Sequence, residues 1–518
     1  MKPSNHNKKW LWLGGLAVYL LMLCLLVLAE RRSPDASIDG FADALWYSLV
    51  TMSTVGYGDL YPVTAPGRVL GAAFVLLSLG MLTFVISLII RIVTGRMLPA
   101  LRLFALRKRH WFLFADRNDC STALAKKLAE NHPEAVFLFP ETGTADLPEG
   151  AMVYPDAMET VALKKKDGCS LFFLDSAGSD VAGAIAALET GHPVYCQTEY
   201  APDTCPEGLV LFNRYDCCAQ AYWKNHGLSR ETQTVLLIGD GNYARYLLDR
   251  AILLNVFSAQ QQICYHLFGN WEEYRRNHHR LGAVVGLNGA GTGDQLYFHA
   301  DSWNEDPHLL AAADRILICH DDVARNLLLL RQLRQYFPTK AEIHLLFDRQ
   351  IPGETVFGTN DEIYTEELVM RGRQSYAARC IHKLYSDSVP GAPRWEQLSE
   401  FLRQSNIASA DHLIVKIRIL LEDMQIRQVT AENCRAAYGR YQELKQTRRE
   451  EFRWIEHQRW QRFHSLYNWR YGPERDNHAR IHPMMRPYEE LEISEQEKDD
   501  YSWELIGLLA GKLNEGLE

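Results

Sequence analysis

The stretch from Thr51 to Asp59 limits what this chain can fold into more than any other part of the sequence. Between Thr54 and Gly58, two glycines alternate with residues that carry side chains. Glycine enters left-handed backbone conformations without steric cost, so this alternation lets successive carbonyl groups point in one direction. One such segment encloses nothing by itself. The pattern therefore predicts several identical copies arranged around a symmetry axis.

Four copies around an axis would form stacked rings of carbonyl oxygens, which can replace the hydration shell of a potassium ion. The segment resembles the selectivity filter of potassium channels and consists of Thr54, Val55, Gly56, Tyr57, Gly58 and Asp59. The resemblance implies a homotetramer with K+ as the permeant ion and with the Thr54 hydroxyl as the innermost ring. A glycine-rich surface turn is the alternative interpretation.

The residues on either side of this filter segment fit the same interpretation. Phe41 to Val50 predicts a short apolar helix with Asp39 as its N-cap, and the negative end of its dipole would point at the ion path. Trp10 to Ala29 is 20 residues without a charge, and a second apolar run extends from Val69 to Val93. Each run is long enough to cross a bilayer as a helix. A signal peptide is the alternative for the first run, although its apolar part exceeds the roughly 7–15 residues typical of one.

Basic residues at the outer ends of both runs predict their orientation. Three lysines precede the first run, and a basic connector from Arg91 to Arg109 follows the second. Such residues stay on the cytoplasmic side, so we expect a multi-pass protein of the plasma (inner) membrane, surrounded by lipid, with both termini cytoplasmic. Gly80, in the middle of the second run, corresponds to the gating hinge of the channels that this chain resembles. The alternative is a glycine that lets helices pack closely.

The charge is distributed unevenly along the chain. Residues 1–110 carry 12 Lys/Arg and 5 Asp/Glu, a net +7, and the total of −9 leaves −16 for the remainder. An acidic soluble part argues against nucleic acid as a partner. The 11 cysteines show no zinc-binding spacing, and reduced thiols are expected for a cytosolic part.

From residue 110 onward, short apolar runs alternate with helical patterns, which is typical of a parallel α/β sheet. The strands predicted for residues 110–230 are 111–115, 135–139, 151–154, 170–174, 194–197 and 209–212. Those predicted for residues 231–395 are 234–239, 263–268, 296–299, 315–319, 342–347 and 362–364. The predicted helices include 121–130, 182–189, 242–253 and 322–336. The sequence therefore predicts two consecutive Rossmann-like units, each of ordinary domain size.

A two-span pore followed by two such units resembles the prokaryotic potassium channels with paired regulator-of-potassium-conductance (RCK) domains. In the first unit, Ala115 to Cys120 stands where a glycine-rich phosphate turn belongs, so we expect no dinucleotide there. The second unit has a Gly-x-Gly-x-x-Ala turn opening a helix, formed by Gly239, Gly241, Asn242 and Ala244. Amides at that helix start would hold an anion or a nucleotide phosphate. The acidic residue expected to bind the ribose is missing, and a purely structural turn is the alternative.

A dense block of aromatic and charged residues near the C-terminus resembles the RyR domain, the repeat named after ryanodine receptors. The resemblance covers roughly Glu456 to Leu509 and implies a small-molecule pocket. We assign this pocket to Trp460, Trp469, Arg470, Tyr471, Gly472, Pro473, Glu474, Arg475, Asp476, His482 and Tyr488. Aromatic faces beside guanidinium groups suit a nucleobase and its phosphate, so a nucleotide is the expected ligand class. The alternative is a small domain stabilised by Arg–carboxylate pairs and packed aromatic rings.

For two smaller features we prefer a structural role, the capping of a helix. Ser409 or Asp411 is expected to cap the apolar helix that begins near Leu413. The cluster Cys319 to Asp322 follows a predicted strand, and such groups cap helices more often than they bind a metal. We therefore expect no metal beyond K+ in the filter.

The expected fold class is a membrane α domain with two transmembrane helices and a pore helix, then two α/β Rossmann-like domains, then a small, mostly α RyR-like domain. The expected boundaries are 1–109 for the pore, 110–230 and 231–395 for the Rossmann-like domains, 396–449 for a helical linker, and 450–518 for the RyR-like domain. No catalytic set has the spacing of a known motif, so the sequence favours a ligand-gated potassium channel over an enzyme. The alternative is a membrane-anchored nucleotide-binding sensor or redox enzyme that uses the Rossmann-like domains.

Overall fold

The computed structural model describes residues 5–92, 98–154, 156–174, 181–199, 206–370, 372–389 and 391–512. The chain divides into two compact units, Met1–Leu106 and Arg107–Glu518. We call them the N-terminal unit and the C-terminal unit. The first boundary lies three residues before the predicted end of the pore domain. The finer divisions of the C-terminal unit stay predictions.

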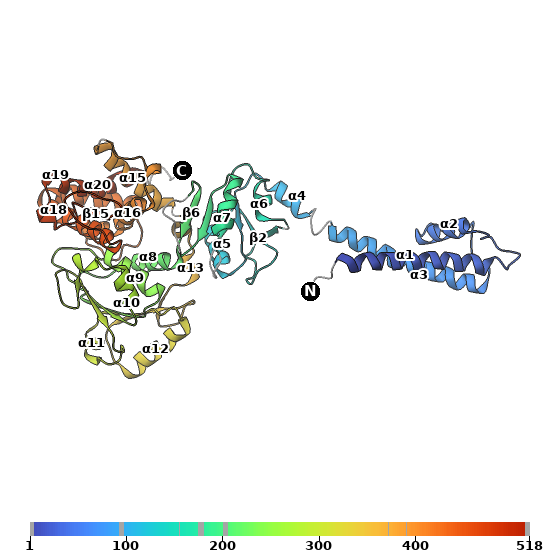
Figure 1. Ribbon diagram of the computed structural model, residues 1–518, viewed down its shortest axis with the longest axis horizontal. Helices are drawn as coiled ribbons and strands as arrows, with labels where there is room; N and C mark the ends of the chain where they lie inside the picture. Colours follow the sequence, from blue (N-terminus) through green and yellow to red (C-terminus); the bar gives the residue numbers. More distant parts are fainter. Residues whose placement is uncertain are drawn as a thin grey trace. The chain divides into compact units, whose positions relative to one another are not determined.

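The N-terminal unit is built from helices. They are α1 (Asn5–Glu30), α2 (Phe41–Met52), α3 (Ala65–Ile92) and α4 (Leu98–Ala105). Figure 1 shows α1 and α3 side by side, with the shorter α2 against them. The helices predicted over the two apolar runs are confirmed; Val93 lies outside the described residues.

Among the residues that the structure describes, no helix combines the length and the apolar composition of a membrane span.

The start of α2 differs from the prediction in its N-cap. Gly40, not Asp39, is the N-cap, with extended backbone at φ −142°. The carboxylate of Asp43, inside the first turn, accepts hydrogen bonds from the amides of Asp39 and Gly40. An acidic side chain in the first turn therefore satisfies amides at the helix start, which is also where the helix dipole favours negative charge.

The first sheet has six strands paired in parallel, in the order β3-β2-β1-β4-β5-β6. The strands are β1 (Trp111–Phe114), β2 (Val136–Pro140), β3 (Met152–Tyr154), β4 (Cys169–Phe173), β5 (Val194–Gln197) and β6 (Leu209–Phe212). The helices are α5 (Asp119–Asn131), α6 (Met158–Ala162), α7 (Val181–Ala187) and α8 (Arg214–Asn225). This is the order of a doubly wound nucleotide-binding sheet, whose ligands bind where the strand order reverses. The six predicted strands are confirmed to within one residue at each end.

The second sheet repeats this arrangement, in the order β13-β12-β11-β7-β8-β10-β9. The strands are β7 (Thr234–Ile238), β8 (Cys264–Phe268), β9 (Gly286–Leu287), β10 (Gln295–His299), β11 (Arg315–Ile318), β12 (Glu342–Leu346) and β13 (Thr355–Phe357). The helices are α9 (Asn242–Leu254), α10 (Glu272–Asn277), α11 (Pro307–Ala312), α12 (Val323–Tyr336) and α13 (Asn360–Ile363).

The strand predicted at 362–364 is wrong, because Glu362 and Ile363 belong to α13 and Tyr364 is its C-cap. The Glu362 carboxylate accepts from the amides of Gly358 and Thr359, which starts a helix with a capping box. β13, which the sequence analysis did not predict, takes the edge position of the sheet.

The remaining elements form a mostly helical region, residues 366–512. It contains α14 (Glu366–Met370), α15 (Gly372–Ser388), α16 (Glu400–Asp411), α17 (Leu413–Leu421), α18 (Ala431–Leu466), α19 (Ile493–Gln496), α20 (Tyr501–Lys512), β14 (Arg470–Tyr471) and β15 (Ile481–His482). α18 has non-helical backbone at Arg448. The predicted cap of α17 is wrong: the N-cap is His412, whose side chain makes no cap bond. Asp411 instead pairs with Arg250, and Ser409 donates to Glu456.

A single hydrophobic core connects both sheets with the helical region. Trp223 of α8 is buried in it and donates its indole N–H to the carbonyl of Leu247 in α9, at 2.8 Å. Trp503 of α20 is likewise buried and donates to the carbonyl of Phe452 in α18. Because continuous apolar packing joins these elements, a structural change in the helical region can be transmitted to both sheets.

Acid should destabilise the C-terminal unit through its buried histidines. Burial lowers the pKa of His344 to about 2 and of His226 to about 4, with Arg315 as the next cause in each case. Between pH 6.5 and 4 the unfolded chain therefore binds protons that the folded chain does not, so stability falls as pH falls. We expect a lower melting temperature at pH 5 than at pH 7.5. The fall in melting temperature between these pH values should be smaller in His344→Gln than in the wild type. Equal acid sensitivity in the variant and the wild type would contradict this explanation.

Candidate functional site

The backbone of the filter segment alternates as the sequence predicts. Gly56 and Gly58 have left-handed backbone at φ +59° and +73°, and so does Thr54 at +62°. The amides of Val55 and Gly56 both donate to the carbonyl of Val50, at 3.1 and 3.3 Å, which ties the filter segment to the end of α2. A left-handed threonine is uncommon. The sequence analysis missed it because glycine is the residue from which we predicted this conformation.

α2 supports the filter segment from the side through Trp46. Its indole N–H donates to the carboxylate of Asp59 at 2.9 Å. Its ring is parallel to that of Tyr57 within 5°, with centroids 6.2 Å apart. Asp59 was predicted as part of the filter segment, but Trp46 was predicted only as an apolar helix residue. The contact holds the segment at both Tyr57 and Asp59.

A buried carboxylate, which the sequence analysis also missed, connects the end of α1 to the segment after the filter. Glu30 has no exposed surface. It accepts from the amides of Val63 and Thr64 and from the Thr64 hydroxyl, at 2.7 to 3.1 Å. A side chain on Gly67 would collide with this carboxylate. Glu30 therefore fixes where α3 begins relative to the filter segment.

The predicted anion site of the second sheet is filled by the protein itself. The carboxylate of Asp321, which follows β11, accepts from the amides of Asn242 and Tyr243, at 3.0 and 3.1 Å. A Cβ on Gly241 would collide with this carboxylate, and one on Gly239 would lie 2.7 Å from the Cys319 backbone. The glycines thus make room for Asp321 and for the neighbouring strand connection. The sequence left a nucleotide site and a purely structural turn open at Gly239 to Ala244, and this geometry favours the structural turn.

Two more polar residues that follow strands cap helices. Asn118, after β1, accepts from the amide of Ser121 and donates to the carbonyl of Leu174, at 2.9 and 2.6 Å. Asp322, after Asp321, accepts from the amides of Ala324 and Arg325. The capping interpretation of the cluster 319–322 is therefore the one that the geometry supports.

The predicted RyR-like pocket separates into an exposed loop and a buried group of rings. The exposed members lie on the loop that includes β14, and they are Arg470, Tyr471, Pro473, Glu474, Arg475 and Asp476. Asp476 accepts from the amides of His478 and Ala479 in a local turn. Gly472 is buried, and a Cβ there would collide with Ile481.

Trp469 does not offer a free aromatic face, which corrects the prediction. It is 5% exposed, and its ring is stacked on Phe401 of α16 at 5.2 Å. Tyr488 is buried too, and its hydroxyl donates to Glu450 at 2.8 Å. These two rings stabilise the domain, as the alternative interpretation proposed.

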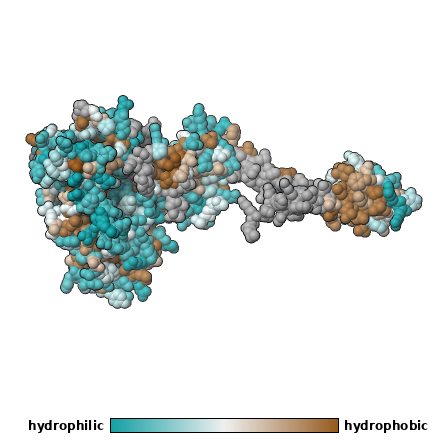
Figure 2. Space-filling view, viewed as in Figure 1, coloured by the Kyte–Doolittle hydropathy of each residue, from teal (hydrophilic) through white to brown (hydrophobic). Residues whose placement is uncertain are grey.

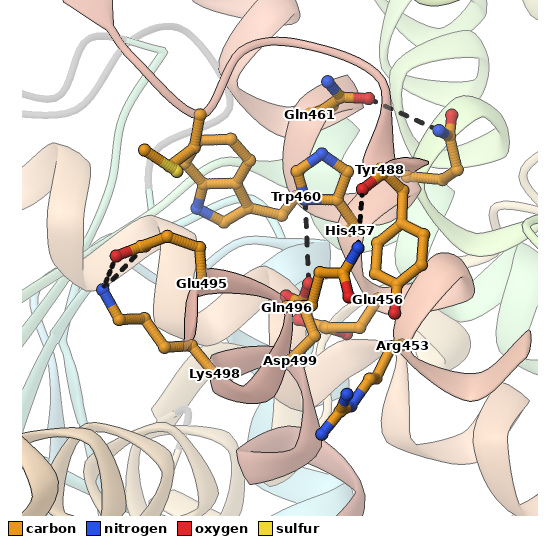
Figure 3. A network of polar contacts seen from close by, with 12 residues as sticks. Arg453, Glu456, His457, Trp460, Gln461, Tyr488, Glu495, Gln496, Lys498 and Asp499 are labelled. Carbon is orange, nitrogen blue, oxygen red and sulfur yellow. Dashed lines mark hydrogen bonds and ion pairs between the residues drawn. The ribbon is translucent and has the colours of Figure 1, made fainter. Parts of the chain in front are cut away.

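Trp460 is the predicted pocket residue with a partly exposed ring beside titratable groups. Its centroid lies 3.9 Å from that of His464 and 5.0 Å from that of His482. Burial lowers the pKa of His482 to about 4, and Arg475 and Lys498 lower it further. Figure 3 shows Trp460, His457 and Tyr488 in a row, with the Glu495–Lys498 pair on the Trp460 side. Because Lys498 is paired with Glu495, Arg475 is the cation that remains for a ligand, and an aromatic face beside a guanidinium is suited to an anionic aromatic ligand.

A buried ionic network lies behind this group, on α17 and α18. The Glu456 carboxylate accepts from Lys416 at 2.8 Å and from Arg459 at 2.7 Å, and all three side chains are at most 7% exposed. Burial lowers the pKa of Lys416 to about 8, opposed by Glu456, whereas Arg459 and Lys416 hold the pKa of Glu456 well below its usual range despite burial. The network thus depends on all three charges.

Comparison with known proteins supports the channel interpretation of the N-terminal unit. A family model described as "Ion channel" matches residues 11–95. A voltage-gated potassium channel of Aeropyrum pernix is 39% identical over 74 residues, which is 14% of this chain and 22% of that protein. Human potassium voltage-gated channel subfamily KQT member 4 is 38% identical over 76 residues, 14% of this chain and 11% of that protein. The chain thus spans about a fifth or less of these curated relatives.

Solved structures align with a larger part of the chain but only loosely. The GsuK channel bound to NAD gives a TM-score of 0.32 at 11% identity, covering 73% of this chain and 86% of that one. GsuK bound to ADP gives 0.34 at 13% identity, covering 70% and 100%. Scores this low do not establish a common fold. The family model and the curated relatives thus show that residues 11–95 match an ion-channel family and are similar to segments of potassium channels.

Proposed function

We propose that this protein is a potassium-selective ion channel formed by four copies of the chain. The alternating left-handed backbone at Thr54, Gly56 and Gly58 carries the proposal. With the Trp46–Asp59 hydrogen bond holding it from the side, this segment would supply consecutive carbonyls that only a symmetric assembly can close into rings. A native mass of four chains in detergent is expected; an active protein of one or two chains would contradict the assembly.

Apolar surface on the N-terminal unit supports a membrane location. Figure 2 shows this unit's described surface as largely hydrophobic. The exposed apolar side chains include Val18, Leu21, Leu25, Leu28, Val69 and Leu76 on α1 and α3. A contiguous apolar surface on this scale needs lipid or a neighbouring subunit to cover it. We place the channel in the plasma (inner) membrane with both termini cytoplasmic, following the basic residues outside the two apolar runs.

The C-terminal unit is proposed to control the pore, with Gly80 within α3 as the hinge. A ligand changes an open–closed equilibrium only by its different affinities for the two states, and typical coupling is about 1–3 kcal/mol. We place the ligand beside Trp460, with Arg475 as the cation, and we propose a nucleotide-type anion. The Asp321 carboxylate takes the alternative phosphate position at α9.

Substitutions beside Trp460 should change the response to ligand and leave ion selectivity intact. Trp460→Ala removes the aromatic face, and Arg475→Gln removes a cation near His482. We expect about a tenfold or larger loss of nucleotide potency in channel recordings, because base stacking contributes roughly 1–3 kcal/mol. Arg435→Gln, at an exposed position of α18, is the control. A wild-type response in both pocket variants would show that the ligand does not bind beside Trp460.

A further inference from the structure

A cavity of about 180 Å³ lies inside the C-terminal unit, away from the Trp460 group. Residues of α8, α9, α14, α15, α16, α17 and α20 line it, together with the segments after α9 and before α18. It is smaller than the roughly 300–1,000 Å³ of typical sites for drug-sized ligands. The cavity therefore suits a small molecule rather than a dinucleotide.

One side of the cavity holds a buried cation without a counter-ion. Arg418 is 1% exposed and donates to two carbonyls, from Nη2 to Lys224 and from Nε to Ile426, at 2.6 and 2.8 Å. In the described part of the chain, no carboxylate lies within ion-pair distance of its guanidinium. Burial, and then Arg427, lower its pKa to about 10, while Asp423 opposes them. Buried charges in proteins are normally paired, so this arginine is an exception.

The other charged groups of the cavity are already neutralised. Lys224 pairs with Glu367 at 2.7 Å. Asp411 pairs with Arg250 at 2.6 Å and accepts from Gln220 at 2.7 Å. The net charge that the lining leaves uncompensated is therefore the positive charge of Arg418.

The rest of the lining is largely apolar. It includes Trp223, Leu254, Leu413, Ile414 and Leu509. A guanidinium fork binds carboxylate or phosphate with two parallel hydrogen bonds. From the cavity, the unpaired cation and these walls, we propose that the cavity binds a small organic anion, with its carboxylate or phosphate at Arg418 and a short apolar body against the walls. Such a ligand contacts α8 and α17 together, so it would stabilise the junction between the first sheet and the helical region.

The proposal is tested by thermal unfolding of the full-length protein with hexanoate, with hexan-1-ol as the neutral counterpart, and with inorganic phosphate as the anion without an apolar body. We expect a concentration-dependent rise in melting temperature with hexanoate and none with hexan-1-ol. Arg418→Gln should weaken the binding of hexanoate by about 30-fold or more, because removing one partner of a buried charge pair costs roughly 2 kcal/mol or more in binding. A rise with phosphate alone that Arg418→Gln removes would also support an anion at this position.

Two further variants separate binding from folding. Ala377→Leu fills the cavity without touching the charge and should remove the hexanoate effect even if Arg418→Gln fails to fold. Arg230→Gln is the matched control, because Arg230 also donates to a carbonyl of α17, that of Ile419, but does not line the cavity. The proposal is overturned if neither anion raises the melting temperature, if hexan-1-ol acts as hexanoate does, or if Ala377→Leu responds like wild type.

Discussion

Gly56→Ala should abolish potassium conduction. Gly56 has φ +59°, where an L side chain is strained, and nothing else lies within 4 Å of a Cβ built there. The strain of about 1–2 kcal/mol per subunit is repeated in every subunit of a symmetric pore. The relaxed backbone would turn carbonyls away from the axis, and an ion would then lose ligands that replace its hydration shell. Potassium flux from proteoliposomes measures the effect.

Gly40→Ala is the matched control in the same unit. Gly40 has φ −142°, which any residue adopts, and a Cβ there approaches only the Asp43 carboxylate, at 3.8 Å. This variant should conduct like the wild type. Retained potassium flux in Gly56→Ala would mean that the segment does not line the ion path.

Glu456→Gln should strongly destabilise the C-terminal unit. The change removes the carboxylate that Lys416 and Arg459 both contact, and it leaves the charged Arg459 with a side chain 2% exposed. Breaking a buried ion pair by removing one partner costs roughly 3–5 kcal/mol, because the remaining charge stays buried. The expected result is a large fall in the thermal unfolding midpoint of the full-length protein.

The control for this variant lies on the same helix. Glu443 pairs with Arg440 at 2.8 Å, but the two side chains are 67% and 45% exposed. Such surface pairs contribute at most about 1 kcal/mol, so Glu443→Gln should change the midpoint little. Equal midpoints for Glu456→Gln and Glu443→Gln would show that the buried network does not stabilise this region.

Local patterns predicted the fold well. The strands of the first sheet and most of those of the second follow from short apolar runs, whereas β9 and β13 were not predicted. The filter segment follows from glycines two residues apart, because this signal also depends on neighbouring residues. The strand prediction for residues 362–364 failed because the capping box formed by Thr359 and Glu362 starts a helix there, which outweighs the apolar character of the segment. A strand and a one-turn helix are hard to separate by composition alone.

The site was less predictable because its contacts join distant parts of the chain. Glu30 binds residues 33 and 34 positions later, and Asp321 caps a helix that begins 79 positions earlier. The composition of the RyR-like block indicated aromatic and basic residues together. It did not indicate that Trp469 would face Phe401 while Trp460 would stay partly exposed.

The central claim is that four filter segments select potassium, and ion flux from proteoliposomes that contain the full-length protein tests it most directly. The measurement compares potassium with sodium under equal gradients, with Gly56→Ala as the non-conducting reference. The structure of the filter segment predicts potassium flux well above sodium flux, and neither flux in the reference. Wild-type liposomes that pass sodium as readily as potassium would contradict the account.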